Sequence, residues 1–243
     1  MRRTAFGLIC LLFSCLPVAA DPLNTALIAY ERGRYIDAIP LLTPLAEGGA
    51  IEAQLALFNI YFFGFGVPVD EVTAMHWLSQ AAERDDPDAL YNLAAMTLEG
   101  KGTDPDPVEA IRLLHRAAEL ESPEAFYLLG MLSVQQAPMT GDIDTGLGYL
   151  ARAAQLGQRS ASAMLAVLLQ EMPEVEHHLV KSAFHFQVAI ARGCTDLKEE
   201  AAMAMARLSP EERKLYDRSL AANLSITASR LGHLEQKGAC LAG

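Results

Sequence analysis

Most of the chain after residue 20 has apolar positions at the spacing of an α-helix. From residue 53 to residue 62, apolar side chains recur every three or four positions, and they do so again over residues 72–82. Between these stretches, Gly64–Pro68 breaks the pattern. Apolar residues at this spacing lie on one face of a helix. The pattern therefore predicts two antiparallel helices joined by a short turn.

The helix pair repeats at a constant step of 36 residues. One marker is a pair of mostly small residues, which recurs at 45–46, 81–82, 117–118, 153–154 and 189–190. Another is an alanine followed four residues later by leucine, which begins at Ala53, Ala89, Ala125 and Ala161. A fixed step of this length is the signature of a helical repeat array. We therefore predict about five helix pairs over residues 21–193.

Capping and turn residues agree with this division. Asp106–Glu109 combines an N-cap, a proline at the first helical position and a capping acid, and Ser122–Glu124 follows the same logic. Two glycine pairs mark the turns within units: Gly64 with Gly66, and Gly100 with Gly102. Glycine there permits the positive φ that a tight loop requires. The alanines at fixed steps are expected where neighbouring helices pack too closely for a larger side chain.

These residues resemble the Sel-one-like repeat family, which is related to the tetratricopeptide repeats. The family pattern is an Ala-x-x-x-Leu start, an inter-helix Gly-x-Gly-Val, a following Asp, then Ala-x-x-Trp and a closing Ala-Ala. The second unit matches it at Ala53, Leu57, Gly64, Gly66, Val67, Asp70, Ala74, Trp77, Ala81 and Ala82. The third unit matches it at Ala89, Leu93, Gly100, Gly102, Asp106, Ala110, Ala117 and Ala118. The resemblance implies an all-α fold, a right-handed α-solenoid of stacked antiparallel helix pairs whose first helices line the concave side.

The outer units depart from the family pattern. The fourth has Gln136–Pro138 in place of the turn glycines, the fifth has Met172–Pro173, and the first has only Gly33–Arg34 between its helices. Irregular terminal units are expected, because they must cover the ends of the stack.

After residue 193 the periodicity fades. Residues 196–208 indicate one helix, and Ser209–Glu212 is a strong start for another that leads to Leu231. We expect capping helices over residues 194–232 and a tail over 233–243. A sixth, diverged unit that docks a partner is the alternative.

The N-terminus has the features of a secretory signal peptide. Arg2 and Arg3 precede an apolar run over residues 5–16, and Pro17–Ala20 supplies the small residues of a cleavage site. We expect cleavage after Ala20, export to the periplasm or the exterior, and membrane contact only through this leader. An uncleaved anchor would need roughly 18 apolar residues without the break at Pro17.

A lipoprotein acylated at Cys15 is a further alternative for the N-terminus. The bulky Phe13 departs from the lipobox pattern, and cleavage before Cys15 would leave an unusual apolar start over residues 16–20. Signal-peptide cleavage after Ala20 is therefore the preferred interpretation.

Charge and motifs narrow the function. With 19 basic and 30 acidic residues, the net charge of −11 would repel duplex nucleic acid. The chain has no Gly-x-Ser-x-Gly, His-Glu-x-x-His, Ser-x-x-Lys or P-loop motif. Gly100–Thr103 resembles a phosphate loop only superficially, because it lies in a predicted turn between helices. We therefore expect neither an enzyme nor a cofactor.

The histidines and cysteines suggest two further kinds of site. His177, His178 and His185 lie near acidic residues, but a solvated loop and helix start explains them without a metal. Cys194 and Cys240 remain after cleavage and can form a disulfide in an oxidising compartment. Such a bond would stabilise the chain by about 4 kcal/mol in the chain-entropy model. Free or intermolecular thiols are the alternative.

Two functions from different classes remain. The first is a non-catalytic scaffold that binds a protein or peptide on its concave surface. The second is a cell-wall hydrolase, similar to β-lactamases, with a loop site that no motif reveals. Some cysteine-rich members of the resembled family have been linked to penicillin binding, but this chain lacks their cysteine spacing. We favour the scaffold.

Amide and aromatic side chains on the first helices are the candidate contact residues. Gln54, Asn59 and Asn92 interrupt helices rich in alanine and leucine, where asparagine is a poor helix former. We expect Asn59 and Asn92 to contact the extended backbone of a partner, with Phe62 or Phe65 as an apolar anchor. The alternative is that each amide satisfies a backbone group of a neighbouring repeat.

Overall fold

The computed structural model describes residues 21–140, 142–173 and 175–227. The predicted signal peptide, the tail over residues 233–243 and Cys240 lie outside the described residues. Within these ranges every regular element is a helix. The helices are α1 (Pro22–Glu31), α2 (Tyr35–Glu47), α3 (Ile51–Phe63), α4 (Glu71–Ala82), α5 (Pro87–Glu99), α6 (Pro107–Glu119), α7 (Pro123–Thr140), α8 (Ile143–Gln155), α9 (Arg159–Gln170), α10 (His178–Ala191), the short 3₁₀ helix η1 (Thr195–Leu197), α11 (Lys198–Ala206) and α12 (Pro210–Thr227).

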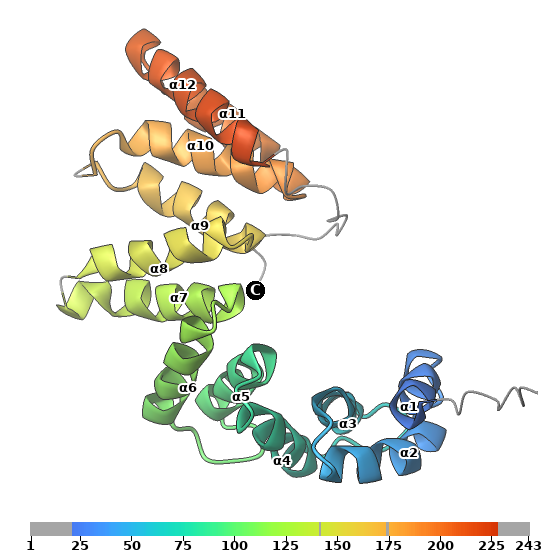
Figure 1. Cartoon of the computed structure of the whole chain (residues 1–243). Helices are drawn as coiled ribbons and strands as arrows, with labels where there is room; N and C mark the ends of the chain where they lie inside the picture. Colours follow the sequence, from blue (N-terminus) through green and yellow to red (C-terminus); the bar gives the residue numbers. More distant parts are fainter. Residues whose placement is uncertain (1–20, 141, 174, 228–243) are drawn as a thin grey trace, which may run out of the picture.

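The helices pack as five consecutive pairs, α1–α2 to α9–α10, which confirms the predicted solenoid. The second helix of each pair contacts the first helix of the next, so the pairs stack in chain order. At the C-terminal end, α11 and α12 pack against α10. Figure 1 shows that the stack curves, and that α1, α3 and α5 lie on the inner side of the curve with α2, α4 and α6 outside them.

Small residues occupy the helix crossings, as the spacing predicts. The repeated alanines have no exposed surface: Ala53, Ala89, Ala125 and Ala161 in the first helices, and Ala81, Ala117 and Ala153 in the second. Large apolar residues at the same step fill the space between them: Leu42, Leu78, Leu114, Leu150 and Phe186, all fully buried. The core is therefore a row of similar layers, one for each helix pair.

Helix starts use the caps predicted at Asp106, Ser122 and Ser209, and two further aspartates cap equivalent helices. Asp70, Asp106 and Asp142 are 36 residues apart, and each accepts a backbone N–H bond at the start of α4, α6 or α8. Ser122 accepts from the backbone N–H of Ala125 at 3.2 Å. Ser209 and Glu212 form the reciprocal pair of a capping box at α12.

Turns within the units depend on glycine. Gly64 and Gly100 end α3 and α5 in the left-handed conformation, with φ of 69° and 73°. The fourth unit has Gln136 at the equivalent position, and α7 continues through it for 18 residues instead of 13. The predicted loss of the turn therefore lengthens the helix.

Turns between units share a left-handed residue that the sequence analysis missed. It recurs every 36 residues at Gly49, Asp85, Glu121, Gly157 and Gly193. Three of these positions are glycine, which favours a positive φ. The second and third units have Asp85 and Glu121 instead, so the repeat of this conformation is not visible in the sequence. Both acids are held by an arginine of the following unit: Arg116 binds Asp85 at 2.5 Å, and Arg152 binds Glu121. These ion pairs link each turn to the next helix pair.

The C-terminal helices differ from the prediction in one respect. The sequence indicates a single helix over residues 196–208, but the structure divides this segment into η1 and α11. The final helix starts at Pro210 as expected and is described as far as Thr227.

Candidate functional site

Side chains of α3 and α5, together with Lys101 after α5 and Glu124 at the start of α7, line two adjoining hollows on the inner side of the curve. One has a volume of about 340 Å³ and is lined by Leu55, Phe58, Asn59, Asp88, Tyr91, Asn92 and Glu124. The other has a volume of about 210 Å³ and is lined by Phe58, Asn59, Phe62, Phe63, Asn92, Ala95, Met96, Glu99 and Lys101. We call the two together the α3–α5 groove. No residue of α2, α4 or α6 lines it, so it opens on the side where α1, α3 and α5 lie in Figure 1.

Both predicted asparagines lie in the α3–α5 groove, but only one amide lacks a partner. Asn59 lies beside the hydroxyl of Tyr30 on α1; burial raises the pKa of this tyrosine, and the Asn59 amide partly opposes the rise. The side chain of Asn92 has no hydrogen-bond partner among the described residues. Asn92 therefore has both its donor and its acceptor free at the centre of the groove.

Gln54, the third amide, does not belong to this surface. It is 1% exposed, and its Nε2 donates to the backbone oxygen of Ala46 on α2 at 2.9 Å. The alternative interpretation, in which an amide satisfies a backbone group of a neighbouring unit, is therefore correct for Gln54. Its role is to join the first two helix pairs.

Phe62 lies in the groove and Phe65 does not. The Nζ atom of Lys101 lies 5.4 Å from the centre of the Phe62 ring and 2.6 Å from Glu99, a geometry that suits a cation–π contact and an ion pair. Phe65 stacks between Tyr35 at 4.9 Å and Phe63 at 5.4 Å. It therefore supports the wall of the groove from outside.

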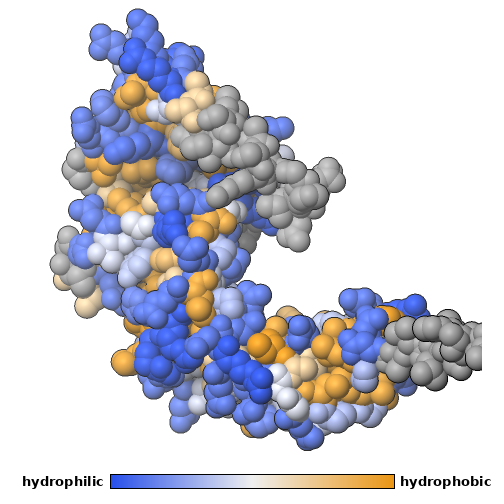
Figure 2. Space-filling view, viewed as in Figure 1, coloured by the Kyte–Doolittle hydropathy of each residue, from blue (hydrophilic) through white to orange (hydrophobic). Residues whose placement is uncertain are grey.

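Phe63 is the exposed aromatic residue of this region. Its side chain is 56% exposed and packs edge-on against Phe62 at 5.0 Å. Figure 2 shows apolar surface along the N-terminal arm, over α1 to α3, and mostly hydrophilic surface around α6. The exposed large apolar residues of this arm are Ile36, Leu41 and Phe63, and Val69 and Val72 follow in the turn after α3 and the first turn of α4.

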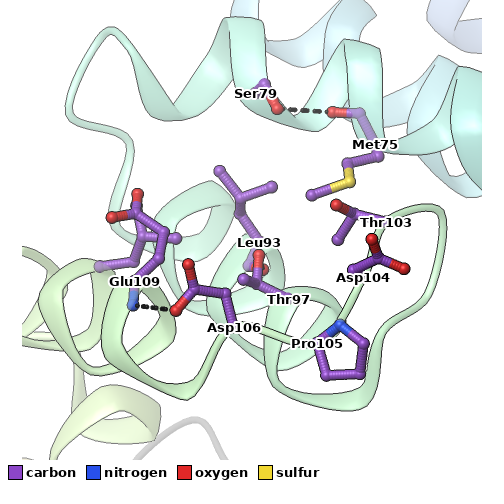
Figure 3. Close-up of a pocket in the computed structure, with 10 residues that line it drawn as sticks. Met75, Ser79, Leu93, Thr97, Thr103, Asp104, Pro105, Asp106 and Glu109 are labelled. Atoms are coloured by element: carbon purple, nitrogen blue, oxygen red, sulfur yellow. Dashed lines mark hydrogen bonds between the residues drawn. The ribbon is translucent and has the colours of Figure 1, made fainter.

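A third hollow, of about 450 Å³, lies between α4, α5 and α6 and contains several polar groups (Figure 3). Those groups serve local helix structure. The carboxylate of Asp106 accepts from the backbone of Glu109, whose own carboxylate binds Arg112, and Ser79 donates to the backbone oxygen of Met75. The neighbouring Gly100–Thr103 segment lies in the turn between α5 and α6, as predicted.

The histidine segment forms the start of α10. His177 takes a left-handed conformation with φ of 57° and precedes His178, the first helical residue, while His185 is partly buried further along the helix. Glu174 lies outside the described residues. In the part of the chain that the structure describes, no group of three or more His, Cys, Asp or Glu residues is placed to hold a metal ion.

Cys194 is fully buried and disulfide-bonded. Because Cys240 lies outside the described residues, its pairing with Cys194 stays a prediction. None of the described helices is both long and apolar enough to span a membrane.

Comparison with known proteins identifies the repeat. The Sel1 repeat family matches residues 51–86, 87–122 and 123–158, which correspond to the pairs α3–α4, α5–α6 and α7–α8. No curated protein sequence matches the chain.

Solved structures show the same fold at low identity. A Sel1 repeat protein from Oxalobacter formigenes is 21% identical, with a TM-score of 0.66 over 83% of this chain and 88% of that one. A protective antigen of uropathogenic Escherichia coli with an SLR fold is 22% identical, with a TM-score of 0.63 over 72% of this chain, which spans only 39% of the antigen. An immunity protein from Pseudomonas aeruginosa is 21% identical, with a TM-score of 0.50 over 84% of this chain and 83% of that one.

Sel1 repeats build helical solenoids, a fold that typically serves protein–protein interaction. The three matched units lie within five stacked helix pairs of the same kind. The chain therefore contains three Sel1 repeats, over residues 51–158.

Proposed function

We propose that this chain is an exported, non-catalytic scaffold that binds a protein or peptide segment in the α3–α5 groove. The observation that carries the proposal is the position of Asn92, whose amide has no partner among the described residues and lies where the two hollows meet. An amide can donate to and accept from an extended peptide backbone at the same time. Phe62, in the same groove, and the exposed Phe63 at its edge supply apolar contact area for the side chains of that segment.

The curvature supports the same function. Stacked helix pairs present a long concave surface built from their first helices, which suits an extended segment better than a small molecule. The groove is open along α3 and α5, and its walls come from consecutive repeats. A bound segment would therefore run across the repeats.

A pull-down from the exporting cell tests the binding surface. Asn92→Ala is expected to weaken capture of the native partner while the free energy of unfolding changes by less than about 1 kcal/mol, since no hydrogen bond is lost. Gln187→Ala is the matched control, because it removes an exposed amide from α10, outside the groove. Equal capture by both variants, or lost stability without lost capture, would contradict the proposal.

Export is tested by terminal sequencing of the protein from the periplasm or medium. The expected first residue is Asp21. This residue caps α1 by accepting the backbone N–H of Leu23 at 3.2 Å, so cleavage after Ala20 leaves the first helix intact. Recovery of Met1, or of a chain acylated at Cys15, would contradict this part of the proposal.

A further inference from the structure

The first helices of the first four pairs carry charge of one sign. Neither Lys, Arg nor His occurs in α1, α3, α5 or α7. Their charged residues are Glu31, Glu52, Asp88, Glu99 and Glu124. The outer helices α6 and α8 carry Arg112, Arg116 and Arg152, and each of these forms an ion pair with an acidic residue. These first helices are thus acidic without a basic side chain, as is α2 among the outer helices, whereas α6 and α8 carry charges of both signs.

Two of these acids line the first hollow of the α3–α5 groove without a cationic partner. Asp88 and Glu124 are 36 residues apart, at the second position of α5 and α7. A favourable interaction with the helix N-terminus explains an acid at this position. It does not explain why both residues face one hollow with no Lys, Arg or His paired to either among the described residues. The one lysine of the groove, Lys101, pairs with Glu99 at the other end.

The remaining walls of this hollow also suit a cation. The aromatic residues Phe58 and Tyr91 and the aliphatic Leu55 line it. Burial raises the pKa of Tyr91, and the charge of Glu124 raises it further, which places the tyrosine hydroxyl within the negative field of this end of the groove. Carboxylates beside aromatic rings recognise the ammonium of lysine and the guanidinium of arginine together with their apolar stems.

We propose that the segment bound in the α3–α5 groove is basic, and that a Lys or Arg side chain of that segment inserts between Asp88 and Glu124 while its backbone passes Asn92. This inference rests on the proposed function and adds the chemistry of the partner. A free metal ion is not the occupant that the aromatic walls favour, and the net charge of −11 would accelerate encounter with a cationic segment.

Selection from a library of random displayed peptides on the mature chain tests the proposal. Enriched peptides are expected to contain more Lys and Arg than the input library. Their affinity, measured by fluorescence anisotropy, is expected to fall about tenfold in the double variant Asp88→Asn/Glu124→Gln, as the loss of two charge contacts implies. The affinity for the unmodified chain is also expected to decrease as ionic strength rises.

A double variant of equal charge change is the control. Glu83→Gln/Glu119→Gln neutralises two exposed acids at the ends of α4 and α6, outside the groove, and is expected to keep full affinity. Thermal unfolding of all variants, followed by circular dichroism, separates lost binding from lost helix stability.

Three results would overturn the inference. They are the absence of Lys and Arg enrichment, equal weakening in both double variants, and no enrichment of any peptide over a selection without protein. Peptides without basic residues whose binding depends on Asn92 would overturn the inference alone and leave the proposed function supported.

Discussion

His185 is a partly buried ionisable residue on α10 whose buried Nδ1 has no hydrogen-bond partner. Burial and the nearby charge of Arg192 lower its pKa from 6.5 to about 4. The unfolded chain therefore binds the proton more readily than the folded chain between these values. The contribution of neutral His185 to the free energy of unfolding is therefore complete above pH 6.5. About 3 kcal/mol of it is expected to be lost as the pH falls to 4.

Urea unfolding at a series of pH values measures this effect. His185→Phe removes the titrating group and is expected to flatten the loss of stability between pH 6.5 and 4. His115→Phe, at an exposed position on α6, is expected to leave the slope unchanged. Identical slopes for the wild type and His185→Phe would show that His185 is not the source of the acid sensitivity.

The amides show how far residue-scale prediction from sequence extends. Gln54 and Asn59 lie on the same helix and look equivalent in the sequence, yet five positions place them about 140° apart around the helix axis. Gln54 consequently faces α2, and Asn59 faces the groove. The repeat pattern predicted the helix and its buried alanines, but the direction of each polar side chain depends on where the neighbouring helix lies.

At the scale of the element, the helix crossings limit side-chain size. Ala117 has no exposed surface and lies where α6 packs in the central layer of the array. Ala117→Leu is expected to overpack this crossing and to cost about 1–3 kcal/mol, seen as a lower denaturant midpoint. Ala202→Leu, at an exposed position on α11, is expected to change the midpoint little. Equal midpoints for the two variants would place the helix interface elsewhere.

Two glycines give opposite expectations for the same substitution. At Gly102, φ is +75°, and an added Cβ would lie 2.6 Å from the backbone oxygen of Glu71. At Gly148, within α8, an added Cβ would meet nothing within 4 Å. Gly102→Ala is therefore expected to lower the melting temperature, whereas Gly148→Ala is expected to stabilise the helix by about 0.5–1 kcal/mol. A loss of stability in both variants would contradict this assignment.

The elements that sequence analysis described incompletely lie where family signals are weak. The glycine turns of the second and third units predicted the ends of α3 and α5. In the fourth unit, the absence of glycine at Gln136 showed that the turn is altered, but not that α7 absorbs its residues. Asp85 and Glu121 take left-handed conformations that could not be predicted from their residue type. The arginines that form ion pairs with them come from the next unit.

At the scale of the whole molecule, stability depends on contacts between neighbours along the stack. Phe186 is fully buried in the C-terminal cluster, whereas the single tryptophan, Trp77, packs between the two N-terminal clusters. Phe186→Ala is expected to cost about 3–5 kcal/mol locally. In denaturant, the helical signal should therefore begin to fall while Trp77 fluorescence stays unchanged, because the repeats transmit stability only to adjacent repeats.

The control for this experiment is a substitution in the N-terminal half. Leu57→Ala, in the cluster beside Trp77, is expected to shift the fluorescence transition itself. Coincident fluorescence and circular dichroism transitions in Phe186→Ala would instead indicate that the array unfolds as one cooperative unit.

The left-handed residue at the end of each unit makes the connections between successive units structurally equivalent. Units that end at Asp85 and Glu121 close in the same backbone conformation, and the residues that follow, Asp86 and Ser122, both cap the next helix through their side chains. A tandem copy of residues 86–121 would therefore meet compatible surfaces on both sides. Gene duplication could lengthen the recognition surface by one helix pair at a time, with no new core to evolve.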